Sequence, residues 1–83
     1  MFKILIVDPT VSFRQSLKNI LIARFPFTDI KEASDGDEGL GNLETSHPNL
    51  IFLEIHLPAE NGLGLARRIK ARYPAIMTES LCQ

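Results

Sequence analysis

The sequence has little cysteine, no long apolar run and almost no net charge, and each absence excludes a class of protein. Its one cysteine, Cys82, has no second cysteine to pair with, which excludes an internal disulfide and favours a reducing, cytoplasmic environment. No apolar run approaches the length that crosses a membrane. Residues 1–7 are mostly apolar, but Asp8 and Pro9 end them well short of the apolar region of a signal peptide.

Charge and length narrow the choice further. Nine basic and ten acidic residues give a formal net charge of -1, which offers no electrostatic basis for binding nucleic acid. The 83 residues suffice for one domain and not for two. A single core of this size supplies roughly 3–5 kcal/mol, and the sequence has no disulfide or evident metal cluster to add to it. We therefore expect association with another chain to supply part of the stability.

Two apolar runs each end at an acidic residue. Residues 50–53 are apolar without alternation, with a turn signal at Pro58 beyond them, which predicts a strand covered on both faces as in a parallel sheet. Residues 3–7 form the second run, which ends at Asp8 as the first ends at Glu54. Ligands collect beyond the carboxyl ends of the strands in open α/β sheets, so these two acids mark the candidate site.

The segments between these runs carry helix and strand signals in turn. An apolar stripe predicts a helix that begins between residues 10 and 12 and ends near Arg24. Residues 28–33 predict a weaker strand suited to an exposed edge. Residues 34–38 open a second helix, which ends near Ser46 and contains two glycines that each cost about 1 kcal/mol relative to alanine.

A third apolar stripe over residues 63–73 predicts another helix, which Pro74 terminates. Residues 75–83 are too short for a further strand and helix, so they are expected to form a stub strand or a frayed tail. The alternation of strand and helix implies a parallel sheet with right-handed crossovers.

Taken together, these segments resemble the receiver domain of two-component response regulators. The resemblance rests on residues 3–8, on 32–40, and on 48–58 followed by Asn61-Gly62, and it covers residues 2–74 without a gap. It implies an α/β fold, a truncated flavodoxin-like (CheY-like) open parallel sheet of three strand–helix units with strand order 2-1-3. A second chain could complete this sheet. The domain is expected to span residues 1–74.

The resemblance also implies a site. In the family an aspartate accepts a phosphoryl group from a histidine kinase, paired acids after the first strand hold Mg²⁺, and a hydroxyl residue and a lysine further along contact the phosphoryl group. Here Glu54 stands at the acceptor position and Pro9 replaces the second acid of the pair. A degenerate acidic pocket of Asp8, Glu54 and His56 is expected. No cofactor is expected, and Asp8 and Glu54 are the only weak candidates to hold Mg²⁺.

This pattern predicts a degenerate receiver-like module that is not an enzyme, is not phosphorylated and acts in the cytoplasm through a homodimer. Without a fourth strand, the third strand would lie at the edge of the sheet with its outer side unpaired. The expected association edge therefore consists of Leu50, Ile51, Phe52 and Leu53, with the tails from residue 75 onward as the other segments that could complete a continuous sheet. A histidine kinase or another signalling protein is the other expected partner class, with no nucleic acid and no membrane.

Several alternatives stay open. Glu54 could accept phosphate with residual Mg²⁺-dependent transfer, or the chain could be a fragment of a longer receiver. Glu54 could also imitate a phosphorylated aspartate permanently. The alternative is that Glu54 is an inert polar residue at the end of a strand. Thr78 is a candidate replacement for the missing hydroxyl, since residues 76–78 faintly resemble a shortened fourth strand.

Overall fold

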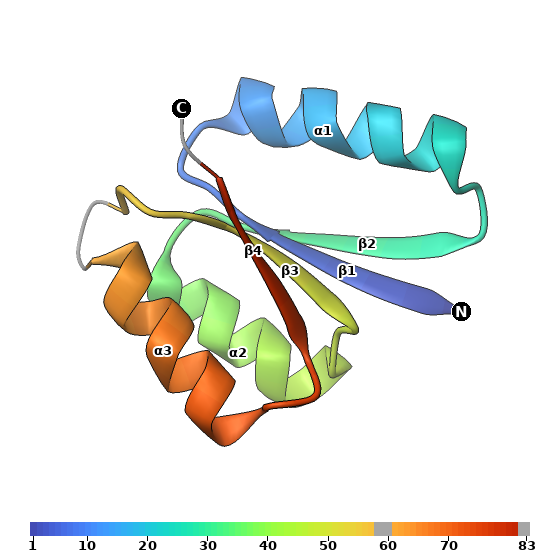
Figure 1. The fold of residues 1–83 in the computed structure, drawn as a ribbon. Coiled ribbons are helices and arrows are strands. Elements are labelled where there is room, and N and C mark those ends of the chain that lie inside the picture. Colours follow the sequence, from blue (N-terminus) through green and yellow to red (C-terminus); the bar gives the residue numbers. More distant parts are fainter. Residues whose placement is uncertain (58–60, 82–83) are drawn as a thin grey trace.

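A computed structural model describes residues 1–57 and 61–81, in which strands and helices alternate along the whole chain (Figure 1). In chain order the elements are β1 (Phe2–Val7), α1 (Val11–Arg24), β2 (Thr28–Ala33), α2 (Gly36–Ser46), β3 (Leu50–Glu54), α3 (Gly62–Arg72) and β4 (Met77–Leu81). Every strand and helix predicted from hydrophobic periodicity is present, and the turn expected at Pro58 lies outside the described residues.

The strands form one parallel sheet in the order β2-β1-β3-β4. The predicted order 2-1-3 is confirmed, as is the edge position of β2. The sheet has one strand more than the predicted three. Residues 75–83 were expected to form either a stub strand or a frayed tail, and residues 77–81 form a strand that pairs with β3. Cys82, the lone cysteine, lies outside the described residues.

β3 is therefore an interior strand. It pairs with β1 on one side and with β4 on the other, where Leu50 lies opposite Met77 and Glu54 opposite Leu81. The expected association edge of Leu50, Ile51, Phe52 and Leu53 is wrong, because the chain's own last strand occupies the positions that a partner's strand would take. The new edge strand carries Thr78, Glu79 and Ser80, and polar side chains of this kind suit an exposed edge.

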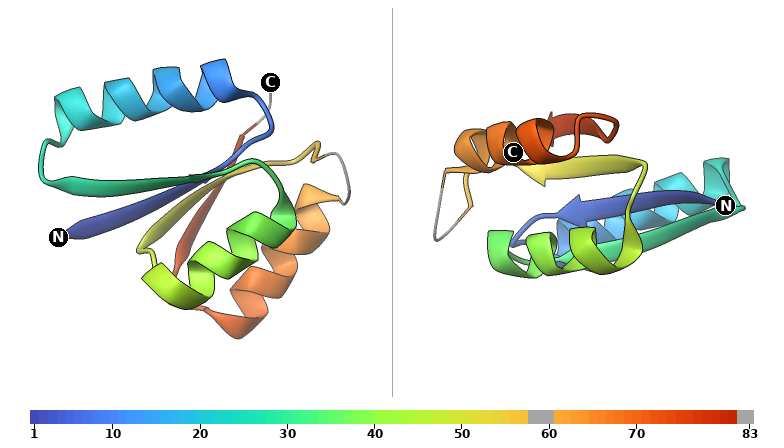
Figure 2. Two further views of the ribbon diagram at one scale, coloured as in Figure 1. Left: turned by 180° about the vertical axis from the view of Figure 1, so that it is seen from behind. Right: turned by 90° about the horizontal axis from the view of Figure 1, so that it is seen from below.

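The two faces of the sheet are covered unequally (Figure 2). On the closed face, Leu5, Val7, Ile51 and Leu53 of the sheet pack with residues of α2 and α3 into one buried cluster. The open face carries Ile4, Ile6, Leu50 and Phe52, and among the described helices only α1 lies on it. None of the residues of α1 is buried. Most of the buried apolar core thus lies on one side of the sheet.

Local hydrogen bonds set where the helices begin and end. Asp35 caps α2 by accepting from the Glu38 amide at 2.9 Å, and Asn61 caps α3 by accepting from the Leu63 amide at 2.9 Å. The C-cap of α2 is His47, whose φ of 48° lies in the left-handed region. Within residues 1–57 and 61–81, no helix combines the length and the hydropathy needed to span a bilayer.

Candidate functional site

The structure brings Asp8 and Glu54 together at the carboxyl edge of the sheet. They directly follow Val7 and Leu53, which are paired across β1 and β3. Both acids are buried, with 0% of Asp8 and 4% of Glu54 exposed. The charge of Glu54 lies close enough to disfavour ionisation of the buried Asp8 carboxyl group.

Each carboxylate is held by a backbone amide two residues further on. The Thr10 amide donates to Oδ1 of Asp8 at 2.7 Å, and the His56 amide donates to Oε1 of Glu54 at 3.0 Å. The loops after β1 and β3 thus use the same short-range bond to fix their acids. One oxygen of each carboxylate is already engaged as an acceptor from the protein itself.

Burial is the largest cause that raises the pKa of Asp8 above its ordinary value of 3.8. The Thr10 amide opposes the rise by hydrogen bonding to the charged form, whereas the nearby charge of Glu54 adds to it. The Thr10 hydroxyl and the Arg14 guanidinium lower the pKa as smaller causes. The net upward direction means that the folded protein holds this proton to a higher pH than the unfolded chain does.

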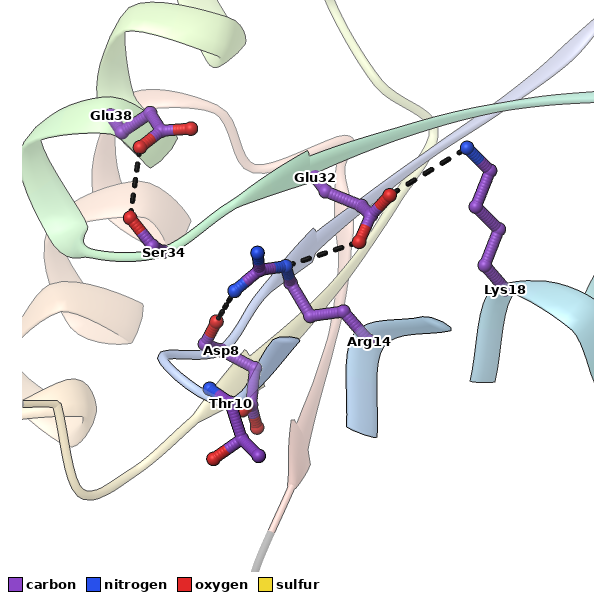
Figure 3. A network of polar contacts seen from close by, with 7 residues as sticks. All are labelled: Asp8, Thr10, Arg14, Lys18, Glu32, Ser34 and Glu38. Carbon is purple, nitrogen blue, oxygen red and sulfur yellow. Dashed lines mark hydrogen bonds and ion pairs between the residues drawn. The ribbon is translucent and has the colours of Figure 1, made fainter. Parts of the chain in front are cut away.

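Arg14 of α1 links the end of β1 to β2 beside Asp8 (Figure 3). Its Nη1 donates to the backbone carbonyl of Asp8, and its Nε donates to Oε1 of Glu32 on β2 at 3.1 Å. Lys18 Nζ lies 3.6 Å from the other oxygen of Glu32. Sequence reasoning missed Arg14, although a cation one turn into a helix that follows a strand-end acid was a usable signal.

A shallow pocket of about 180 Å³ opens beside Glu54, lined by Pro9, Thr10, Glu54 and His56. His56 is exposed, and its backbone forms an isolated antiparallel bridge with Asn61. Two of the three predicted site residues, Glu54 and His56, therefore line the pocket, and Asp8 is buried next to Glu54. Pro9 occupies the place where the family resemblance implies a second acid, and it supplies no side-chain oxygen.

Gly62 sets the position of α3 against this site. Its amide donates to the Ile55 carbonyl at 2.8 Å, directly after β3. A Cβ atom on Gly62 would lie 2.6 Å from the Ile55 Cα and 2.7 Å from the Ile55 carbonyl oxygen, closer than side chains tolerate. The Asn61-Gly62 pair that carries part of the family resemblance thus has a packing reason, because only glycine allows this approach of helix to strand.

The donor set does not fit the Mg²⁺ site that the family resemblance implies. Mg²⁺ requires near-octahedral oxygen ligands at about 2.0–2.1 Å, usually with one or two carboxylates free to coordinate. Here Pro9 removes one carboxylate, and a backbone amide already binds one oxygen of Asp8 and one oxygen of Glu54. Among the described residues, no group of three or more His, Cys, Asp or Glu side chains is arranged to hold a metal.

Thr78 does not reach the site. It pairs with Ile51, three residues before the Leu81–Glu54 pair, which places it about 10 Å from the carboxyl edge. Its hydroxyl oxygen is buried and has no hydrogen-bond partner. The hypothesis that Thr78 replaces the family's hydroxyl residue is therefore wrong, because the strand runs further than the resemblance over residues 76–78 suggested.

The comparisons with known proteins agree with this fold and site. The sequence matches the family described as the response regulator receiver domain over residues 4–79. This match spans most of the chain, so the chain belongs to the receiver domain family. The fold is accordingly the flavodoxin-like, CheY-like parallel sheet that the sequence predicted.

The relatives include enzymes and regulators. The chain is 36% identical over 74 residues to protein-glutamate methylesterase/protein-glutamine glutaminase 4 of Geobacter metallireducens, covering 89% of this chain and 21% of that protein. It is 30% identical over 74 residues to the transcriptional regulatory protein DegU of Brevibacillus brevis, covering 89% of this chain and 31% of that protein. The chain therefore spans about a fifth to a third of these relatives.

Solved structures of similar fold include receiver domains. The CheY-like response regulator receiver domain protein of Methanospirillum hungatei matches with a TM-score of 0.89 and 28% identity, over 99% of this chain and 64% of that one. The signal receiver domain of a DNA-binding response regulator from Colwellia psychrerythraea matches with a TM-score of 0.92 and 25% identity, over 99% and 68%. The chain thus spans about two thirds of these receiver structures.

Proposed function

We propose that this chain is a receiver-type module of two-component signalling that does not accept a phosphoryl group and acts by associating with another protein. The observation that carries the first half is the pair of amide-held, buried carboxylates of Asp8 and Glu54 beside Pro9. In-line phosphoryl transfer depends on positioning and on neutralisation of charge by bound cations. A longer acceptor side chain in a pocket without a fitting metal site provides neither.

The second half of the proposal concerns partners. Family membership supports a histidine kinase or another signalling protein as one partner class, and the cytoplasm as the place of action, in keeping with a lone cysteine. A second copy of the chain is the other partner that we propose. Its support no longer comes from β3, which is paired on both sides, but from the exposed apolar surface of the open face.

The loss of phosphoacceptor chemistry is tested by incubation with acetyl phosphate and Mg²⁺, followed by intact mass measurement. We expect the mass to stay unchanged. A phosphate-sized increase that Glu54→Gln abolishes would instead establish Glu54 as a phosphoacceptor and overturn this half of the proposal. Glu54→Gln is a close control because its amide oxygen can still accept from the His56 amide.

A variant that restores the acids of the family pattern tests whether Mg²⁺ binding can be regained. Replacing Pro9→Asp and Glu54→Asp together returns both positions to the pattern that the resemblance implies. We expect this double variant to bind Mg²⁺ in isothermal titration calorimetry at concentrations where the parent chain shows no binding heat. Equal binding by both proteins would mean that these two positions are not what limits the metal site.

A further inference from the structure

Glu54 is a buried carboxylate that the described residues do not pair with a cation. Only 4% of the residue is exposed. Its Oε1 accepts from the His56 amide at 3.0 Å. Within residues 1–57 and 61–81, no hydrogen bond reaches the other carboxylate oxygen and no ion pair involves Glu54. Buried charges in proteins are normally paired with an opposite charge, so this carboxylate points to a cationic ligand.

The second oxygen of Glu54 opens into the shallow pocket at the carboxyl edge of the sheet. Among the described residues, the Thr78 hydroxyl is the one buried side-chain oxygen or nitrogen without a hydrogen-bond partner, so the unbonded oxygen of Glu54 keeps contact with solvent. The pocket of about 180 Å³ provides this contact, and its other lining residues, Pro9, Thr10 and His56, are all exposed. The carboxylate therefore forms the floor of the pocket and the three exposed residues form its rim.

The size and lining of this pocket suit one lysine side chain. At about 30 Å³ for each water molecule, the pocket has room for about six waters, and a lysine side chain has about five non-hydrogen atoms. The ring of Pro9 offers an apolar wall for the carbon stem. The Thr10 hydroxyl hydrogen bonds to Asp8, and its oxygen can still accept from an ammonium. A hollow with an apolar wall and an acidic floor matches the two parts of lysine.

The one unbonded oxygen favours an ammonium over the other common cations. A guanidinium pairs best with both oxygens of a carboxylate at once, and the His56 amide already binds one oxygen of Glu54. Mg²⁺ needs a near-octahedral set of oxygen ligands, which this pocket does not supply. An ammonium is a compact charge with several N–H donors, so one carboxylate oxygen and neutral acceptors at the rim satisfy it.

We propose that this pocket binds the side chain of a lysine from a partner protein, whose ammonium donates to the unbonded oxygen of Glu54 and whose carbon stem lies along Pro9. The contact is charge-assisted and lies at a buried carboxylate, where screening by solvent is weaker than at the surface. The inference rests on the association half of the proposed function, for which it names the chemistry of the partner. It does not rest on the loss of phosphoacceptor chemistry.

NMR titration of the full chain with N-acetyl-lysine methylamide at neutral pH and fixed ionic strength tests the proposal. We expect saturable shifts of the His56 and Thr10 amide signals in about the millimolar range, since a single side chain makes few contacts. The amide of Ile69 in the closed core should not shift. The same molecule with its ammonium acetylated should give no saturable shift, and the arginine analogue should bind more weakly than lysine.

A pair of variants assigns the binding to Glu54. Glu54→Gln should weaken binding at least about tenfold, because it removes the charge while its amide oxygen still accepts from His56. The matched control is Glu79→Gln, which removes the same charge from an exposed residue of β4 and should leave binding unchanged within about twofold. Circular dichroism should show both variants folded, and the comparison of analogues on the parent chain needs no variant.

Other outcomes overturn the proposal in distinct ways. Absence of saturable shifts with the lysine analogue removes lysine as the ligand. Equal binding of the acetylated analogue leaves only an apolar hollow, and equal binding of the arginine analogue removes the preference for an ammonium. Binding of butylammonium without binding of the lysine analogue would assign the pocket to a free amine and not to a protein side chain. Labelling by acetyl phosphate would overturn the loss of phosphoacceptor chemistry and leave this titration as a separate result.

Discussion

The two faces of the sheet differ in what covers them, and this difference organises the molecule. On the closed face two helices bury side chains of β1 and β3 completely, as the 0% exposure of Ile51 and the 1% exposure of Leu53 illustrate. On the open face β3 presents Leu50 and Phe52, which are only half-buried, whereas Ile4 and Ile6 of β1 are buried there. Neighbouring residues of β3 therefore belong to a finished core or to an unfinished one, depending on the direction of the side chain.

The largest expected effect compares one substitution on both faces. Leu53→Ala should lower the free energy of unfolding by about 2–5 kcal/mol, because it leaves a cavity in the closed core. Leu50→Ala removes the same atoms from the open face and should cost less than about 2 kcal/mol, since solvent already reaches that side chain. Urea denaturation monitored by circular dichroism measures both, and equal losses would contradict the distinction between the faces.

The next effect concerns the seating of α3 on the closed face. Gly62→Ala should destabilise the fold by about 1–3 kcal/mol, because the added Cβ meets backbone atoms of Ile55 that cannot move aside cheaply. Gly64→Ala is the matched control in the same helix, where nothing lies within 4 Å of the added Cβ. That variant should gain about 1 kcal/mol from helix propensity, so thermal unfolding should separate the two variants in opposite directions.

A smaller effect is expected where β4 meets the closed face. Thr78→Val replaces a buried hydroxyl that has no hydrogen-bond partner with a methyl group of similar size. The variant should be more stable by about 1 kcal/mol, because the cost of burying an unsatisfied polar group disappears. Ser80→Ala on the same strand changes an exposed residue and should stay within about 0.5 kcal/mol of the parent in the same denaturation experiment.

The smallest expected effect is the pH dependence of stability that Asp8 causes at the carboxyl edge of the sheet. Because the pKa of Asp8 is raised in the folded state, the folded protein binds more protons than the unfolded chain above pH 3.8. The free energy of unfolding should therefore fall as the pH rises from that value through the raised pKa. Asp8→Asn should remove this fall and stabilise the protein on the alkaline side, since the amide oxygen can still accept from Thr10.

Denaturation at a series of pH values measures this effect. Glu54→Gln should weaken the same fall without abolishing it, because it removes the smaller, repulsive contribution to the pKa of Asp8 and leaves the burial. Parallel pH profiles for the parent and Asp8→Asn would show that Asp8 does not carry the pH dependence.

Much of the site was predictable because it depends on short stretches of sequence. Asp8 and Glu54 were recognised as strand-end acids, and the parallel pairing of β1 with β3 then brings them together. Arg14 was missed, because its link to Asp8 and Glu32 joins three elements that are distant in the sequence. The upward shift in the pKa of Asp8 likewise depends on burial, which no single segment specifies.

By itself the sequence determined the alternation of strands and helices and the acids at the strand ends, and its resemblance to the receiver family implied the order of the first three strands. The alternation and the strand ends follow from hydrophobic periodicity, caps and turns, which act over a few residues. Only the tertiary structure decided that β4 exists and closes the outer side of β3. A strand at an edge is held by backbone hydrogen bonds to its neighbour, and those bonds need no apolar side-chain pattern that a sequence would reveal.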